Sequence, residues 1–143
     1  MGKKNPDEFR LSPQDYRAML KHVQLEDISL EECSAKVRRD KPDKSVGIAV
    51  KDKISAELQG ENSVQIDHSY ELVASPGAKK DFVLKIACVF RLRYSSNEPL
   101  TEDFLEIFRK RNVPLNTWPF FRELVQSITQ RMNLPPLTLP LLK

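Results

Sequence analysis

The chain has 143 residues, of which 40% are hydrophobic and 30% are charged, so one domain with one core is expected. The 23 basic residues barely outnumber the 20 acidic ones, and this balance does not demand a nucleic-acid partner. No apolar run approaches the roughly 20 residues of a membrane-spanning helix, and residues 1–10 contain no apolar core of a secretion signal. We therefore expect a cytoplasmic protein.

A flexible segment and a short helix are expected at the N-terminus. Residues 1–11 are mostly polar, which is typical of a flexible terminus, and the single domain is predicted to span residues 12–143. Ser12 followed by Pro13 is a typical helix start, with serine as the N-cap and proline in the first turn. Apolar residues then recur at helical spacing, which predicts a helix over residues 13–22.

Apolar and polar residues alternate in the next part of the chain, as in strands with one buried face. The alternation is weak over residues 22–33 and clear over 46–58, 64–74 and 82–94. The charged residues 34–45 are predicted to form a loop between the first two strands. Four consecutive strands predict an antiparallel meander.

Two helices are predicted after the strands. Thr101 caps the first, which has acidic residues in its first turn and basic residues in its last, as suits the helix dipole. Residues 112–114 end this helix. The second helix is predicted over residues 118–133, where apolar residues recur at i, i+3, i+4 and i+7. Strands followed by helices predict an α+β fold with both helices on one face of the sheet.

The sequence contains none of the common catalytic or nucleotide-binding motifs. It has four glycines, no GxxxxGK[ST] or GxGxxG loop, and no GxSxG, HExxH or CxxC. Cys33 and Cys88 are expected to be reduced thiols, one of them in the core, and His22 and His68 do not complete a zinc site with them. His68 lies on the apolar side of its strand, which favours a buried, hydrogen-bonded histidine over a general base. We therefore expect no enzyme activity, no cofactor and no metal.

The C-terminal 28 residues are the most informative part of the chain. Trp118, Phe120 and Phe121 open the last helix, and Pro135 and Pro136 follow it. Because proline neither continues a helix nor donates to a strand ladder, the tail after them is predicted to be extended. Its leucines must then bury against this chain, a second copy or another protein. These leucines are Leu137, Leu139, Leu141 and Leu142.

Several blocks of the sequence resemble the SecB family of protein-export chaperones. The strongest block is residues 118–123 (WPFFRE) with Pro135 downstream. Residues 27–31 (DISLE) are similar to a run in the first strand of the family, and the two long strands over 64–94 also match. The run at residues 134–139 (LPPLTL) is most similar to solitary SecB-like chaperones, some of which accompany toxin–antitoxin pairs.

The resemblance implies a homotetramer, built as a dimer of dimers, that holds unfolded polypeptides without ATP. In the family, an acidic sheet face and a zinc-binding tail dock the export motor ATPase. Asp27 and Glu31 match that face, but Lys85 replaces an acidic residue and no Cys/His tail follows, so a general or dedicated holdase is predicted. A groove near the loop 36–44 and the tail is predicted to bind clients. Its candidate residues are Leu30, Val46, Ile48, Trp118, Phe121, Leu137 and Leu139.

Other interpretations remain open from the sequence. The aromatic cluster of the last helix also fits packing against the sheet or a second subunit, and the tail also fits docking against its own chain. RNA binding is an alternative function, because a set of basic residues shares the exposed side of the strands, although few aromatics accompany them for base stacking. These residues are Lys51, Lys53, Lys85, Arg91 and Arg93. A third alternative is a structural oligomer that binds neither RNA nor a client.

Overall fold

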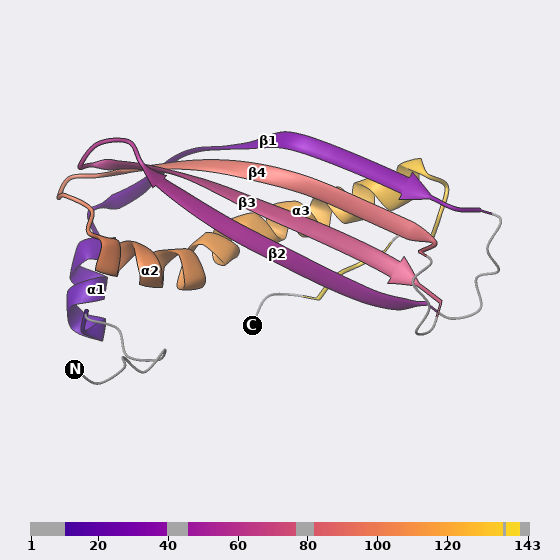
Figure 1. Cartoon of the computed structure of the whole chain (residues 1–143), viewed down its shortest axis with the longest axis horizontal. Coiled ribbons are helices and arrows are strands. Elements are labelled where there is room, and N and C mark those ends of the chain that lie inside the picture. Colours follow the sequence, from indigo (N-terminus) through magenta and orange to yellow (C-terminus); the bar gives the residue numbers. More distant parts are fainter. Residues whose placement is uncertain (1–10, 40–45, 77–81, 136, 141–143) are drawn as a thin grey trace.

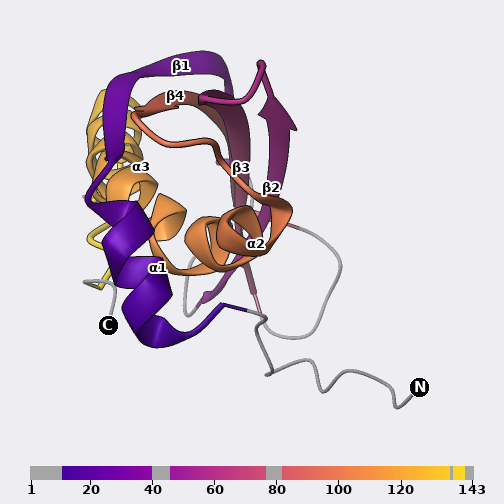
Figure 2. The ribbon, with the colours of Figure 1, turned by 90° about the vertical axis from the view of Figure 1, so that its left-hand side faces the viewer.

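The computed structural model describes residues 11–39, 46–76, 82–135 and 137–140. Its elements in chain order are α1 (Pro13–Leu20), β1 (Val23–Val37), β2 (Gly47–Leu58), β3 (Ser63–Ser75), β4 (Leu84–Ser96), α2 (Glu102–Arg111) and α3 (Val113–Arg131). The four strands form one antiparallel sheet, and the helices lie on one of its faces (Figures 1 and 2). The predicted α+β class is confirmed.

The first helix begins where the sequence predicts. The Ser12 hydroxyl accepts a hydrogen bond from the Asp15 N–H at 3.1 Å, and Pro13 occupies the first turn. Tyr16 anchors the helix, because its buried ring stacks on Phe104 with the ring centroids 5.1 Å apart. The predicted flexible N-terminus falls largely on residues that lie outside the described part of the chain.

The strand order β1-β4-β3-β2 refines the predicted four-stranded antiparallel sheet. Strands β2, β3 and β4 pair in chain order and form the meander, whereas β1 pairs with β4 and not with β2. The connection from β1 to β2 therefore joins the two opposite edges of the sheet. Alternation in the sequence indicates a strand but does not show which other strands pair with it. The pairing of β1 with β4 was therefore not predicted.

Strand β1 also extends beyond its predicted end. Residues 34–37 belong to it, where Lys36 pairs with Lys85 and Val37 with Leu84, so the prediction of a loop over residues 34–45 is wrong for this part. The rest of that prediction falls largely on residues 40–45, which are outside the described residues. Most side chains of β1 are exposed on both faces because it is an edge strand.

The core lies between the two central strands and α3. Alternate residues of β3 and β4 are buried over their whole lengths, which confirms the predicted buried faces. Phe121 and Val125 of α3 pack beneath them and are fully buried. Figure 2 shows α3 running under the sheet and α2 beside it, and α2 contacts β2 while α3 contacts β3.

The two C-terminal helices are confirmed, with one change of boundary. The Thr101 hydroxyl accepts a hydrogen bond from the Phe104 N–H at 3.1 Å at the start of α2, as predicted. Helix α3 begins at Val113 and not at residue 118, because Pro114 is in the first turn, where a missing N–H costs no helical bond. No helix in the described residues is long and apolar enough to cross a bilayer.

The helix layer covers the centre of the sheet better than its edges. Leu30 of β1 lies opposite buried Phe90, on the helix side of the sheet, yet 45% of Leu30 is exposed. Ile48 of β2 lies opposite buried Ala74 in the same way and is 43% exposed. Both edges of the sheet therefore present apolar side chains that this chain leaves partly open.

Candidate functional site

A groove of about 320 Å³, which we call the sheet-end groove, lies where β1 and β3 end and β2 and β4 begin. In Figure 1 this is the end of the sheet toward which the β1 and β3 arrows point. The other side of the groove is formed by the last turns of α3 and the residues after it. Its walls are largely apolar, with contributions from Val37, Val46, Ile48, Val83, Leu84 and Leu137.

The structure brings some of the predicted client-binding residues together and separates others. Val46, Ile48 and Leu137 line the sheet-end groove, although Leu137 is far from the other two in sequence. Leu30 lies further along β1, opposite Phe90, and is outside the groove. The sequence placed all of these residues on apolar faces, but only the strand order shows which of them meet.

Trp118 and Phe121, the aromatic candidates on α3, do not line the groove and instead contact Tyr70 in the middle of β3. Phe121 is fully buried, and its ring stacks on Tyr70 with a centroid distance of 4.4 Å and an interplanar angle of 9°. Trp118 is half-buried, and its Nε1–H donates to the Pro140 carbonyl at 2.8 Å. A fully buried side chain cannot touch a client in this conformation, so Phe121 fits the alternative of packing against the sheet.

The tail after α3 is extended, as predicted, and α3 side chains hold its backbone. The Arg122 Nε–H donates to the Leu139 carbonyl at 2.8 Å, and the Thr129 hydroxyl accepts from the Leu137 N–H at 3.1 Å. Leu139 is only 5% exposed and joins the core. Within the described tail, Leu139 therefore docks against its own chain, while Leu137 contributes to the groove. Pro136, Leu141 and Leu142 lie outside the described residues.

Sequence reasoning missed two arginines of the sheet-end groove, Arg38 and Arg39. They follow β1 directly, in the charged loop near which the groove was predicted, but they were not named among its candidate residues. Arg39 donates from its Nη2 to the Met132 carbonyl at the end of α3, and the Arg38 Cζ lies 4.1 Å from the centroid of the Phe82 ring. A signal in the sequence was present: paired arginines directly follow the apolar residue Val37, where a strand end meets the core.

A chain of hydrogen bonds connects a fully buried histidine to the surface. His68 Nε2 lies 2.8 Å from Asp52 Oδ2, and its Nδ1 lies 2.7 Å from the Thr117 hydroxyl, which is 2.8 Å from the Tyr70 hydroxyl. Because a carboxylate only accepts, Nε2 carries the ring proton and Nδ1 accepts from Thr117. Both ring nitrogens are satisfied, which confirms the prediction of a buried, hydrogen-bonded histidine.

Burial controls the ionisation of this network. It lowers the pKa of His68, and the hydrogen bond and charge of Asp52 oppose this effect. Burial also raises the pKa of Tyr70 to about 12. The histidine is therefore neutral at pH 7, and the Thr117 hydroxyl is fully buried. This network resembles a catalytic triad only in its residue types, because a nucleophile without access to solvent cannot meet a substrate.

The two cysteines are free thiols, as predicted, and they are direct partners in the β1–β4 register. Cys33 is exposed on the edge strand, whereas Cys88 lies in the core, where burial raises its pKa to about 12. No group of three or more His, Cys, Asp or Glu residues in the described part of the chain could hold a metal ion.

The outer face of the sheet, opposite the helices, carries charges of both signs. Arg91 forms ion pairs with Asp67 at 2.9 Å and with Glu31 at 3.1 Å, and Arg93 lies 3.7 Å from Asp27. The predicted basic residues share this face, but carboxylates interleave with them. This mixture removes the continuous basic surface on which the RNA-binding alternative depended.

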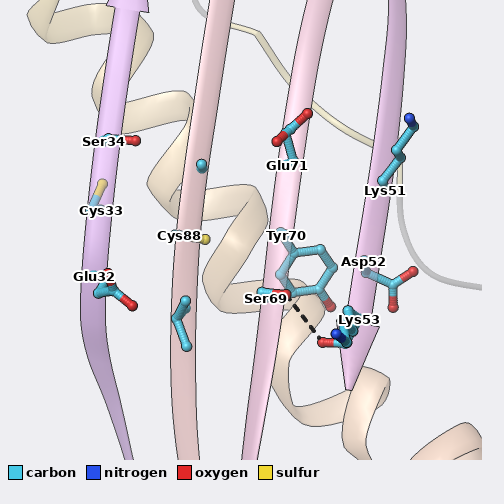
Figure 3. A pocket seen from close by; sticks show the side chains of 12 residues that line it. Glu32, Cys33, Ser34, Lys51, Asp52, Lys53, Ser69, Tyr70, Glu71 and Cys88 are labelled. Carbon is cyan, nitrogen blue, oxygen red and sulfur yellow. Dashed lines mark hydrogen bonds between the residues drawn. The ribbon is translucent and has the colours of Figure 1, made fainter. Parts of the chain in front are cut away.

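A hollow of about 530 Å³ is lined by residues of all four strands, and Figure 3 shows their side chains. Lys51 and Lys53 lie at its β2 side, Glu71 lies on β3, and Glu32 lies at its β1 side. The Ser69 hydroxyl between them lies 3.4 Å from the Lys53 carbonyl. With opposite charges at its two ends and a broad opening, this hollow offers no focused site for an anion or a nucleic acid.

The antiparallel sheet, the helices on one face and the C-terminal segment define the fold of a SecB-like chaperone. The solved structure of the SecB-like chaperone Rv1957 from Mycobacterium tuberculosis, in complex with a ChAD peptide from the Rv1956 HigA1 antitoxin, shows this fold. It is 24% identical, with a TM-score of 0.78 over 90% of this chain and 96% of that chain. This likeness establishes the fold, and the function has to be argued from the site.

Other comparisons add little. A protein of unknown function from Streptococcus agalactiae has a TM-score of 0.41 at 16% identity, over 83% of this chain and 97% of that chain, and it carries no argument. No protein-family model and no curated protein sequence matches the chain.

Proposed function

We propose that the protein is a holdase chaperone that binds unfolded, apolar segments of other polypeptides in the sheet-end groove without using ATP. The observation that carries the proposal is the groove itself, where apolar side chains from the ends of the strands face the tail. The likeness to a SecB-like chaperone in complex with a peptide supports it. The sequence has no nucleotide-binding motif, which fits passive holding.

Burial of apolar surface supplies the binding free energy in this proposal. Each Å² of apolar area removed from water contributes about 25 cal/mol, and this contribution is non-directional. The groove has a volume at the lower end of the range for ligand pockets, so it accepts a few side chains of an extended segment. Low sequence selectivity follows, as a protein that holds varied unfolded chains requires.

The candidate residues have different roles in this proposal. Val46, Ile48 and Leu137 contact the client directly because they line the groove. Phe121 and Leu139 are buried and stabilise the fold, and half-buried Trp118 holds the tail through Pro140. Leu30, exposed on β1, adds a separate apolar contact for the same extended client.

The proposed partners are other polypeptides and further copies of this chain in the cytoplasm. The dedicated client is an antitoxin segment, because the similar chaperone Rv1957 was solved with an antitoxin peptide. Holding precursors for export is the broader alternative. Asp27 and Glu31 are already engaged in ion pairs with Arg93 and Arg91, so docking of an export motor through them is not part of the proposal.

An aggregation assay with a matched pair of variants tests the proposal. We expect the parent to keep a slow-folding client soluble without nucleotide, and Ile48→Asp to lose most of this protection because a carboxylate resists burial in the groove. Leu115→Asp is the control, since Leu115 is 57% exposed near the start of α3 and does not line the groove. Circular dichroism and gel filtration verify that both variants fold and assemble. A parent without protection, or equal protection by Ile48→Asp, would contradict the proposal.

A further inference from the structure

We propose that the sheet-end groove selects apolar segments that are flanked by acidic side chains. This inference rests on the proposed function and names the chemistry of its client. It starts from the charges of the groove: the only charged residues that line it in the described part of the chain are Arg38 and Arg39, and both are cationic. A groove with apolar walls and two arginines at the end of β1 attracts a carboxylate and repels a lysine.

The position of Arg39 leaves its charge available to a client. It donates a hydrogen bond to the Met132 carbonyl, a group without net charge, so this bond orients the guanidinium but does not neutralise it. The contact also ties the end of β1 to the end of α3. Arg39 is therefore held at the rim of the groove by the two elements that form its walls.

Arg38 extends the positive region around the end of the sheet. Its guanidinium lies over the Phe82 ring in a cation–π contact, with its Cζ 4.1 Å from the ring centroid. A neighbouring hollow shares Arg38 and adds Lys36 and Lys85, which are direct partners in the β1–β4 register. None of the described residues that line these two hollows has a carboxylate side chain.

The occupant that fits these features is an extended peptide with apolar residues in its middle and aspartate or glutamate beside them. The apolar residues fill the groove, and a carboxylate meets Arg39, whose guanidinium can bind a carboxylate through paired N–H donors. Such ion pairs are partly exposed, so the gain is modest: we expect acidic flanks to tighten binding by about threefold to tenfold over neutral ones. Basic flanks weaken it.

The experiment compares three fluorescein-labelled peptides with one common apolar core and aspartate, serine or lysine flanks. Fluorescence anisotropy with the full chain is expected to rank aspartate first, serine second and lysine last at low salt. The differences are expected to shrink at about 0.5 M salt, because screening acts on the flanks, whereas binding of the serine peptide persists. Equal affinities for the three peptides at low salt would overturn the inference and leave the proposed function standing.

Charge-reversal variants locate the effect. Arg38→Glu and Arg39→Glu are each expected to remove the preference for aspartate flanks, while the serine peptide still binds. Using both variants keeps the test valid if loss of the Arg39–Met132 contact affects folding. Arg17→Glu is the control, since this exposed residue on α1 changes the charge equally at the other end of the molecule. An unchanged aspartate preference in Arg38→Glu overturns the inference. If no peptide binds to the parent, the proposed function fails, and the inference fails with it.

Discussion

At the scale of single residues, His68 shows how this core accommodates a polar side chain. Its two ring nitrogens have partners on two elements, Asp52 on β2 and Thr117 on α3, so the ring links the sheet to the helix. The sequence placed His68 on the buried side of its strand. It did not identify the partners, because each lies far from His68 along the chain.

The lowered pKa of His68 predicts a stability that depends on pH. The unfolded chain binds a proton at His68 below about pH 6.5, whereas the folded protein does so only at lower pH. The stabilising effect of the neutral ring is therefore present above pH 6.5 and is lost as the pH falls below it. We expect the thermal midpoint to drop between about pH 7.5 and pH 5.5, and to drop less in His68→Gln. Identical drops in the two proteins would show that His68 does not contribute to the pH dependence.

At the scale of elements, α3 places two consecutive aromatic residues in different environments. Phe121 faces the sheet and is fully buried against Tyr70, whereas Phe120 is 49% exposed. The sequence predicted this helix from its apolar repeat, but placed its start at residue 118. Pro114 explains this error: residues 112–114 were predicted only to end the preceding helix, whereas α3 uses Pro114 in its own first turn.

Alanine substitutions at these two positions test the packing of α3. Phe121→Ala is expected to cost about 3–5 kcal/mol of unfolding free energy, because it leaves a cavity in a fully buried site. Phe120→Ala is expected to cost less than about 1 kcal/mol, since its side chain keeps contact with water. Chemical denaturation gives both values. If Phe121→Ala retained the parent's stability but lost client binding, Phe121 would line a client site and our assignment to the core would be wrong.

At the scale of the whole molecule, the helices leave both edges of the sheet incompletely covered. Leu25 and Leu30 on β1, and Ile48, Val50 and Leu58 on β2, are each at least one-third exposed on a strand whose partners are buried. Apolar surface of this kind on a small domain is typical of a contact with another chain. Of these five residues, only Ile48 lines the sheet-end groove. The other four could be covered by a second copy of the chain or by a longer client.

We expect the chain to form a homotetramer, which would cover part of this surface. Sedimentation equilibrium at micromolar concentration is expected to give four times the chain mass of 16.5 kDa. Leu25→Asp is expected to lower the mass at a given concentration, because it places a carboxylate on the exposed edge of β1. Arg17→Glu changes the charge away from this edge and is expected to keep the parent's mass. A parent that sediments only as a monomer would rule out the tetramer.

The sequence alone determined the features that depend on neighbouring residues. Alternation marked the buried faces of β3 and β4, caps marked the starts of α1 and α2, and prolines marked the extended tail. The C-terminal motif resembled the SecB family, whose fold the chain has. These signals are local, because side-chain direction in a strand or helix repeats over two to four residues.

Only the tertiary structure decided which distant segments meet. Pairing of β1 with β4 brings Val37 and Arg38 to the same groove as Ile48, from the opposite edge strand, and the tail returns to place Leu137 there. The alternation over β1 is weak, so the sequence-based prediction ended this strand too early and assigned the two arginines after it to a charged loop. The candidate site is built from such long-range contacts. Their free energy depends on the whole fold, so a local sequence pattern cannot predict them.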